Sequence, residues 1–428
     1  MSAAALALLV TLVVLLLSSA PIAVALGLTA FLYFFYFTTV PLTQVPDTLT
    51  NALNSFPLVA VPFFVLAATI MSRGGISTRL TQAGLAVVGG YRGGLAMTAV
   101  LSCMFFAAVS GSSPATVVAV GTVLIPVMAR SGYDREFATG TIATSGSLGI
   151  LIPPSIPLIV YGIVTETSIG DLFLAGVLPG LLAGALLLVL VAVVSRRRGY
   201  GAGSEAIVMT REEKVRAIRD SVLSLLLPVF VLGGIYTGFF TPTEAAAMAV
   251  LYALLVSLLV YREIGWRDVG PILLRSARLS AMIMFIIANG ILFSFVLTYE
   301  RIPGEITAAL LDLNLQPWMF LTLVVILLLI VGCFMETSSA ILILAPILLP
   351  IGLELGVDPV HLGIIIVMTM EIGMITPPLG LNLFVASGIS RMSVLRVAKA
   401  ALPSAAVLLV ALVLVTAIPA ISLALVGD

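Results

Sequence analysis

Long apolar runs, separated by short polar or Gly- and Pro-containing stretches, make up most of this chain. In the first half they predict helices near 3–26, 28–38, 56–72, 93–109, 114–130, 135–150, 155–166 and 172–195. In the second half they predict helices near 221–239, 243–262, 279–298, 317–335, 338–353, 360–373, 379–390 and 400–425. A membrane-crossing helix needs about 20 predominantly apolar residues, so several segments are too short to span. The pattern predicts an all-α polytopic membrane protein.

Composition strengthens this interpretation, because 61% of the 428 residues are hydrophobic and only 9% are charged, against about 25% charged in a soluble domain. No room remains for a sizeable soluble domain. The N-terminal apolar run lacks a basic start and is longer than a signal-peptide core, so we expect retained membrane helices there. A net charge of zero argues against a nucleic-acid partner. Cys103 and Cys333 lie in apolar runs, where we expect buried thiols rather than a disulfide or metal site.

Basic residues gather in one polar segment, 196–220, which holds seven of the chain's 20 Lys and Arg residues. Cytoplasmic loops of membrane proteins carry an excess of these residues. We therefore expect a cytoplasmic loop that divides the chain into two halves.

The two halves contain an internal repeat at a constant offset of 224 residues. Pro and Gly carry the signal, because scattered Leu and Val matches mean little in an apolar chain. The matched pairs are Pro126 with Pro350, Gly132 with Gly356, Gly149 with Gly373, Pro153 with Pro377, Pro154 with Pro378 and Pro179 with Pro403. Duplicated halves are a common transporter design, and they are inverted if an odd number of crossings separates them.

A first kind of break interrupts the apolar runs at "VSGSSPAT", 109–116. Pro114 suits the first turn of a helix, with Ser112 or Ser113 as the N-cap. An ordinary buried cap would explain the segment. A helix N-terminus that faces an anion at mid-membrane would explain it equally well.

A second kind of break is "GILIPPSIP" in the first half and "GMITPPLGL" in the second. Each proline removes the N–H that would bond a carbonyl four residues earlier. We therefore expect free carbonyls at Gly149 and Ile150, and at Gly373 and Met374. Free carbonyls inside a membrane must line a cavity, meet other protein groups or bind a cation such as Na⁺. Proline-kinked helices satisfied by nearby hydroxyls are the alternative.

Two carboxylates are predicted to lie within the membrane. Glu336 stands in "METSSA", which is offset by 224 residues from the first break, and Glu371 precedes the second Pro-Pro segment. Intramembrane acids are functional candidates by default. Glu336 could instead cap the helix that follows it.

The motifs "FFAAVSGSSPAT", "LGILIPPSIPLIVYG", "GFFTPTEAAA" and "IGMITPPLGLNLFVASGIS" resemble the large membrane subunit of TRAP transporters, and the resemblance covers essentially the whole chain. It implies an elevator-type secondary transporter with two inverted repeats, each containing a re-entrant helical hairpin and a broken helix. It further implies sodium-driven import of an organic anion, usually a carboxylate, across a bacterial or archaeal cytoplasmic membrane. The implied partners are a periplasmic solute-binding protein and a small four-helix membrane subunit.

The resemblance also implies a division of the chain. N-terminal scaffold helices would occupy 1–55, a first repeat 56–195, the basic loop 196–220, central scaffold helices 221–278 and a second repeat 279–428. The hairpin tips would lie near 110–116 and 335–340, and the unwound segments at 149–157 and 373–382.

The family's sites carry over to particular residues. One sodium site would involve Ser110, Ser113, Gly149, Ile152 and Pro153. The other would involve Thr337, Ser338, Gly373, Met374 and Thr376. Substrate would bind near Gly111, Ser112, Ser155, Glu336 and Asn382. The family commonly has an acidic residue at the position of Glu336, often aspartate, so the longer side chain here leaves its role open.

Other functions remain open from the residues alone. A membrane-embedded enzyme would need convergent catalytic groups, and Glu336 with Glu371 is the only candidate pair. A channel fits two matched breaks less well than alternating access does. Proton coupling through Glu336 or Glu371 is the alternative to sodium coupling.

Overall fold

The computed structural model describes residues 3–18, 20–200, 209–311 and 315–427. In these ranges the regular structure is helical, and eight helices are long and apolar enough to cross a membrane. The helices of the first half are α1 (Ala3–Leu17), α2 (Ile22–Tyr36), α3 (Gln44–Leu53), η1 (Phe56–Val59), α4 (Ala60–Arg73), α5 (Ile76–Val88), α6 (Gly94–Ser110), α7 (Ser113–Arg130), α8 (Arg135–Ser147), η2 (Leu148–Ile150), α9 (Ile156–Val164) and α10 (Ile169–Arg198).

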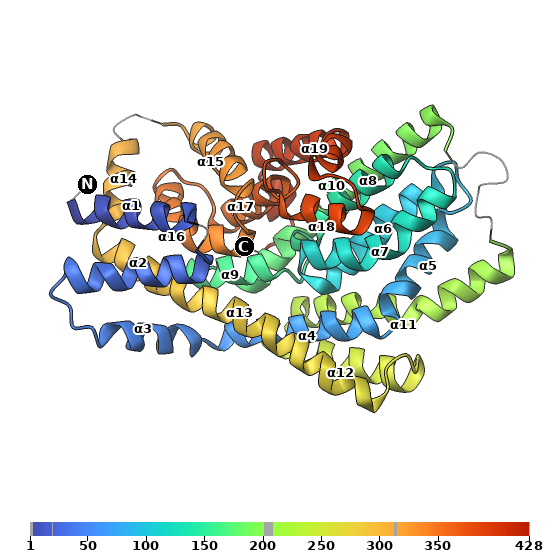
Figure 1. Cartoon of the computed structure of the whole chain (residues 1–428), viewed down its shortest axis with the longest axis horizontal. Coiled ribbons are helices and arrows are strands. Elements are labelled where there is room, and N and C mark those ends of the chain that lie inside the picture. Colours follow the sequence, from blue (N-terminus) through green and yellow to red (C-terminus); the bar gives the residue numbers. More distant parts are fainter. Residues whose placement is uncertain (1–2, 19, 201–208, 312–314, 428) are drawn as a thin grey trace.

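The second half is likewise built of helices (Figure 1). They are α11 (Arg211–Tyr236), α12 (Pro242–Leu255), the π-helical turn η4 (Val256–Val260), α13 (Trp266–Tyr299), α14 (Ile302–Leu311), α15 (Pro317–Gly332), α16 (Thr337–Glu354), α17 (Pro359–Gly373), α18 (Leu381–Ser390), α19 (Val394–Ala417) and α20 (Ala420–Leu423).

The observed helices differ from the predicted ones at several places. The first predicted helix, 3–26, is two helices, because α1 ends at Leu17 and α2 starts after Pro21. Three further helices, α3, α5 and α14, were not predicted. The α3 and α5 segments mix polar and apolar residues, so they form no continuous apolar run.

The predicted loop 196–220 is helical at both ends. The α10 helix continues to Arg198 and ends at Gly199, which adopts the left-handed conformation. The α11 helix begins at Arg211, because Thr210 and Glu213 form a reciprocal capping box. A basic composition does not prevent helix formation, and the segment from 201 to 208 lies outside the described residues.

The helices of the two halves correspond at the offset found in the sequence. The first residues of α7 and α16 are 224 positions apart, and so are their last residues. The starts of α8 and α17 have the same separation. The Pro153–Pro154 and Pro377–Pro378 peptide bonds are both cis. The internal repeat is therefore a repeat of structure as well as of sequence.

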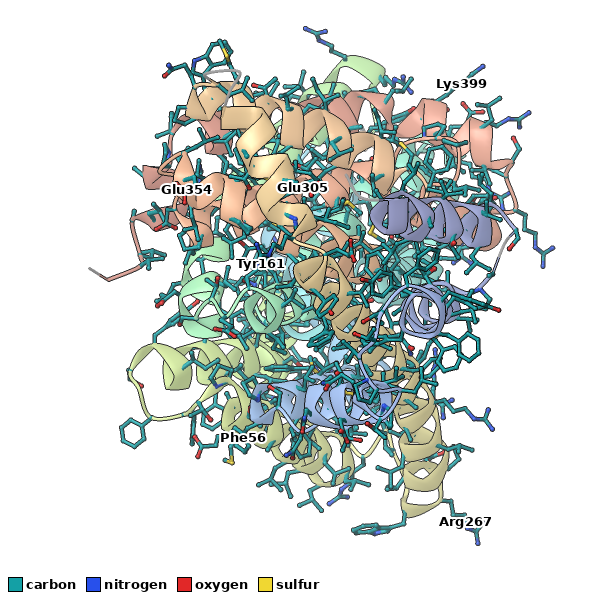
Figure 2. The ribbon with its side chains drawn as sticks, turned by 90° about the vertical axis from the view of Figure 1, so that its left-hand side faces the viewer. Phe56, Tyr161, Arg267, Glu305, Glu354 and Lys399 are labelled. Atoms are coloured by element: carbon teal, nitrogen blue, oxygen red, sulfur yellow. The ribbon has the colours of Figure 1, made fainter. Side chains whose placement is uncertain are left out.

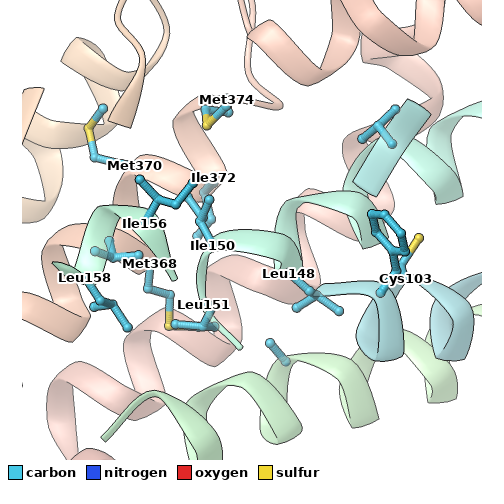
Figure 3. Close-up of a cluster of buried hydrophobic side chains, with 14 of the residues drawn as sticks. Cys103, Leu148, Ile150, Leu151, Ile156, Leu158, Met368, Met370, Ile372 and Met374 are labelled. Carbon is cyan, nitrogen blue, oxygen red and sulfur yellow. The ribbon is translucent and has the colours of Figure 1, made fainter. Parts of the chain in front are cut away.

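The two halves also pack against each other reciprocally. The α9 helix packs against α16, while its counterpart α18 packs against α7. Likewise α17 packs against α10, and its counterpart α8 packs against α19. Figure 3 shows this junction, where Ile150, Leu151 and Ile156 lie beside Met368 and Ile372 of α17.

The remaining helices surround this junction. The long α13 helix crosses the molecule and contacts α2, α3, α4 and α16 (Figure 1). The α12 helix packs on α4, and α11 packs on α5. Tyr161 of α9 lies in the interior and donates a hydrogen bond of 2.8 Å to the Pro359 carbonyl at the start of α17 (Figure 2). This hydrogen bond joins the two broken helices at the start of α17.

Candidate functional site

The first tip is a tight turn between α6 and α7. Gly111 adopts a left-handed φ of 58°, and the extended Ser112 is the N-cap of α7. Ser110 Oγ lies 2.8 Å from Thr116 Oγ1, and Thr116 Oγ1 donates to the Ser112 carbonyl at 2.9 Å. These hydrogen bonds join residues of the turn to one another. They leave the N-terminus of α7 exposed.

This tip packs against the first broken helix. Ser113 Oγ donates to the Ser147 carbonyl at 2.9 Å, and the Ile156 N–H donates to the Gly111 carbonyl at 3.3 Å. A Cβ at Gly149 would lie 2.6 Å from Thr116 Oγ1. The tip and the unwound segment are therefore in direct contact.

Three of the carbonyls that were predicted to be free near the Pro-Pro segments accept hydrogen bonds. The Ile150 carbonyl accepts a 2.5 Å hydrogen bond from Ser155 Oγ. The Gly373 carbonyl accepts from the Thr376 N–H at 2.9 Å, and the Met374 carbonyl from the Asn382 N–H at 3.1 Å. Local donors replace those that proline removes. A carbonyl oxygen has two lone pairs, so each can still accept a second interaction.

The second tip joins α15 to α16, and Glu336 is the N-cap of α16. Its carboxylate accepts hydrogen bonds from Ser338 Oγ at 3.0 Å, the Ser339 N–H at 3.1 Å and Ser339 Oγ at 3.3 Å. The capping role considered for Glu336 is confirmed. Its negative charge is directed at the positive end of its own helix.

The second tip also contacts its unwound segment. Thr337 Oγ1 lies 3.2 Å from Met374 Sδ. A Cβ at Gly373 would lie 2.5 Å from Cα of Gly332, so only glycine permits this approach of α15 to α17. Asn382 is fully buried, and both polar atoms of its side chain lack a partner among the described residues.

Glu371 lies in the same interior. It is 1% exposed, and neither carboxylate oxygen has a hydrogen-bond partner among the described residues. It occupies the position in α17 that Ser147 occupies in α8.

A cavity of about 690 Å³ lies between the tips and the helices α2, α4 and α13. Of the predicted site residues, it is lined by Ser110, Gly111, Ser112, Ser113, Glu336, Ser338 and Met374. The others do not line it: Gly149, Ile152, Pro153, Ser155, Thr337, Gly373, Thr376 and Asn382. Both tips therefore face one cavity.

Two arginines that line the cavity were missed by the sequence analysis. Arg73 is the last residue of α4, and Arg275 lies in the first third of α13. Each interrupts or ends a largely apolar run, and that signal could have marked them.

Comparison with known proteins decides the family. The model of the tripartite ATP-independent periplasmic transporter DctM component matches residues 9–421. The chain belongs to this family. It is a TRAP transporter large permease, so it is a multi-pass membrane protein and a transporter subunit rather than an enzyme.

Related permeases are named for several different substrates. It is 50% identical to the C4-dicarboxylate TRAP transporter large permease protein DctM of Pseudomonas aeruginosa, over 94% of this chain and 93% of that protein. The protein of the same name in Rhodobacter capsulatus is 45% identical, over 97% of both chains. The sialic acid TRAP transporter large permease SiaM of Vibrio cholerae is 35% identical, over 88% of this chain and 87% of that protein.

Solved structures of other transporters share the fold. MtrF of Neisseria gonorrhoeae superimposes with a TM-score of 0.61 at 14% identity, over 92% of both chains. The YdaH transporter of Alcanivorax borkumensis gives a TM-score of 0.59 at 18% identity, over 89% of both chains. The permease therefore has the overall architecture of these transporters.

Proposed function

We propose that this permease imports a C4-dicarboxylate across a bacterial or archaeal cytoplasmic membrane, driven by a sodium gradient. A periplasmic solute-binding protein delivers the substrate, and a small four-helix membrane subunit completes the transporter. The observation that carries the proposal is the pair of structurally equivalent tips facing one cavity. Paired broken elements at a repeat interface are the usual place for substrate and coupling ions.

The substrate class is supported by the names of related permeases. Those named for C4-dicarboxylates are 45–50% identical to this chain, whereas those named for isethionate and sialic acid are 41% and 35% identical. All three substrate types are organic acids. The exposed N-terminus of α7 suits an anion, since its free N–H groups and dipole favour negative charge.

The coupling sites are assigned to the places where a tip meets an unwound segment. The first sodium site comprises Ser110, Ser113, Gly149, Ile152 and Pro153. The second comprises Thr337, Ser338, Gly373, Met374 and Thr376. Hydroxyl and carbonyl oxygens, which hard cations prefer, converge at the first place. At the second place, Thr337 Oγ1 lies 3.2 Å from Met374 Sδ.

Substrate is assigned to the cavity between these sites, near Gly111, Ser112 and Glu336. Ser155 and Asn382 support that wall from behind, because they bond Ile150 and Met374, which line the cavity. In the elevator mechanism, the two repeats carry these sites past the scaffold helices of 1–55 and 221–278. The halves are then inverted with respect to the membrane.

Reconstituted uptake tests the coupling. The permease, its small subunit and its binding protein are placed in liposomes, and succinate uptake is measured under imposed sodium or proton gradients. We expect uptake to require sodium. Uptake that ignores sodium and follows the pH gradient would contradict the proposal and favour a proton at Glu336 or Glu371.

Variants test the sites. We expect Ser110→Ala and Thr337→Ala to raise the sodium concentration for half-maximal uptake by about tenfold each, because each loses an oxygen that contacts the charged ion. Thr122→Ala is the matched control, because this exposed threonine bonds only carbonyls of its own helix α7. If all three variants need the same sodium concentration for half-maximal uptake, the tips do not contribute to the cation sites.

A further inference from the structure

One end of the cavity is positively charged. Arg73 at the end of α4 and Arg275 on α13 both line it, and α4 and α13 are neighbouring helices. On α13 the other lining residues are Leu279, Met282, Ile283, Phe285, Ile286 and Ile287, and most of them follow at helical spacing. Arg275 therefore continues an apolar stripe that faces the cavity.

Both arginines lack a counter-charge. Within the described ranges, neither guanidinium makes an ion pair or a side-chain hydrogen bond. By contrast, Arg79, Arg198 and Arg396 all have acidic partners. Both arginines are exposed, and a carboxylate that enters the cavity can form charge-assisted hydrogen bonds with them.

The acidic residue that lines the cavity does not supply this charge. Glu336 directs its carboxylate to Ser338, Ser339 and the first turn of α16. These bonds hold the carboxylate at the first turn of α16. A carboxylate that enters the cavity would supply the counter-charge for Arg73 and Arg275.

We propose that Arg73 and Arg275 form a carboxylate-binding position in the cavity, and that it selects substrates with two carboxylates. This inference rests on the proposed function, because it concerns the same substrate. An arginine fork binds a carboxylate through two parallel hydrogen bonds, so two arginines match a dianion. Arg275 lies in the segment 221–278 that is assigned to the scaffold, whereas Arg73 and the two tips lie in the assigned repeats. The substrate therefore meets Arg275 only in the states in which the tips face α13.

Binding of two probes tests the inference. The permease complex is reconstituted in nanodiscs with saturating sodium, and equilibrium dialysis measures binding of succinate and of succinamate, its monoamide. We expect Arg73→Gln and Arg275→Gln each to weaken succinate binding by about tenfold. Both should weaken succinamate binding less, so the preference for the dianion falls.

Arg278→Gln is the matched control, because Arg278 stands one turn further along α13 and does not line the cavity. We expect it to bind both probes as the unmodified complex does. Arg73 also lies in the last turn of α4, where a cation stabilises the helix end. If Arg73→Gln fails to fold, Arg275→Gln carries the test, because Arg275 is far from either end of α13.

Unchanged succinate binding in Arg275→Gln would overturn the inference, as would an equal loss in Arg278→Gln. Absence of saturable succinate binding by the unmodified complex would overturn it together with the substrate class. Sodium-driven uptake, measured with the same preparations, separates the two proposals. If uptake does not depend on sodium, the coupling is contradicted but the binding result for the arginines still stands. If uptake depends on sodium and the arginine variants bind succinate normally, only the arginine site is rejected.

Discussion

Glu336 and Ser112 hold equivalent N-cap positions in the two repeats, but they satisfy their helices differently. The Glu336 carboxylate accepts the Ser339 N–H and two serine hydroxyls. The Ser112 side chain makes no capping bond with α7. The α16 N-terminus is therefore stabilised by its own side chain, whereas the α7 N-terminus keeps its donors available.

This difference predicts unequal effects of alanine. We expect Glu336→Ala to lower the free energy of unfolding by about 1 kcal/mol, the usual contribution of an N-cap side chain. Ser112→Ala should leave it nearly unchanged. Thermal unfolding of the purified variants measures both, and equal destabilisation would show that the Glu336 bonds do not stabilise α16.

At the scale of elements, the contact between the first tip and its broken helix depends on a glycine. A Cβ at Gly149 would lie 2.6 Å from Thr116 Oγ1 and 2.8 Å from the Ser112 carbonyl oxygen. The second of these is backbone, so it cannot rotate away. Any side chain here must push the tip off η2.

We therefore expect Gly149→Ala to destabilise the protein by about 1–3 kcal/mol, as overpacking of a buried contact does, and to weaken sodium dependence of uptake. Gly388→Ala is the control, because a Cβ at this position of α18 meets nothing within 4 Å. That variant should be neutral or slightly more stable, since alanine is the better helix former. Unfolding and uptake are measured on the same samples, and a neutral Gly149→Ala would mean that the tip is not held against η2.

Which elements could be predicted depends on what their residues contact. The helices α7, α16 and α10 have long apolar runs that end near Gly, so sequence alone locates them closely. The helix α19 is Val394–Ala417, so the predicted range 400–425 was shifted and ran through Pro419. The helices α3 and α5 bury one side only. Polar residues on the other side interrupt their apolar runs, so the sequence did not predict these helices. A window of hydrophobicity cannot detect a helix stabilised mainly by its neighbours.

The same limit applies to the site. The positions of Pro and Gly predicted the tips, the broken helices and their correspondence between the two halves, since these residues change the backbone wherever they occur. The bond from Ser155 to the Ile150 carbonyl, five residues earlier, matches the alternative in which a nearby hydroxyl satisfies a carbonyl freed by proline. The sequence did not predict that α4 and α13 would bring Arg73 and Arg275 to the cavity, because that depends on long-range packing, which no local pattern encodes.

At the scale of the whole molecule, the arginine end of the cavity lies on the side of the basic segment 196–220. Arg79 follows Arg73 closely in the chain and pairs with Glu263, just before α13, at 3.3 Å. The Arg79 carbonyl also accepts a bond from Ser221 of α11, the helix that starts in the basic segment. By the positive-inside rule we expect this side to be cytoplasmic, so the cavity's arginine end should face the cytoplasm.

Labelling with a membrane-impermeant thiol reagent tests this orientation. Ser72→Cys lines the cavity beside Arg73, whereas Phe239→Cys is 82% exposed in the turn at the other end of α11. That helix has 26 residues and is about 39 Å long at 1.5 Å per residue, which is enough to cross the membrane. We expect Ser72→Cys to react in inside-out vesicles and Phe239→Cys in right-side-out vesicles. Sodium with succinate should change the rate only at Ser72→Cys, because only that site shares the cavity with the moving tips. The native Cys103 and Cys333 are buried, so the unmodified protein supplies the background, and the reverse pattern would place the basic segment outside the cell.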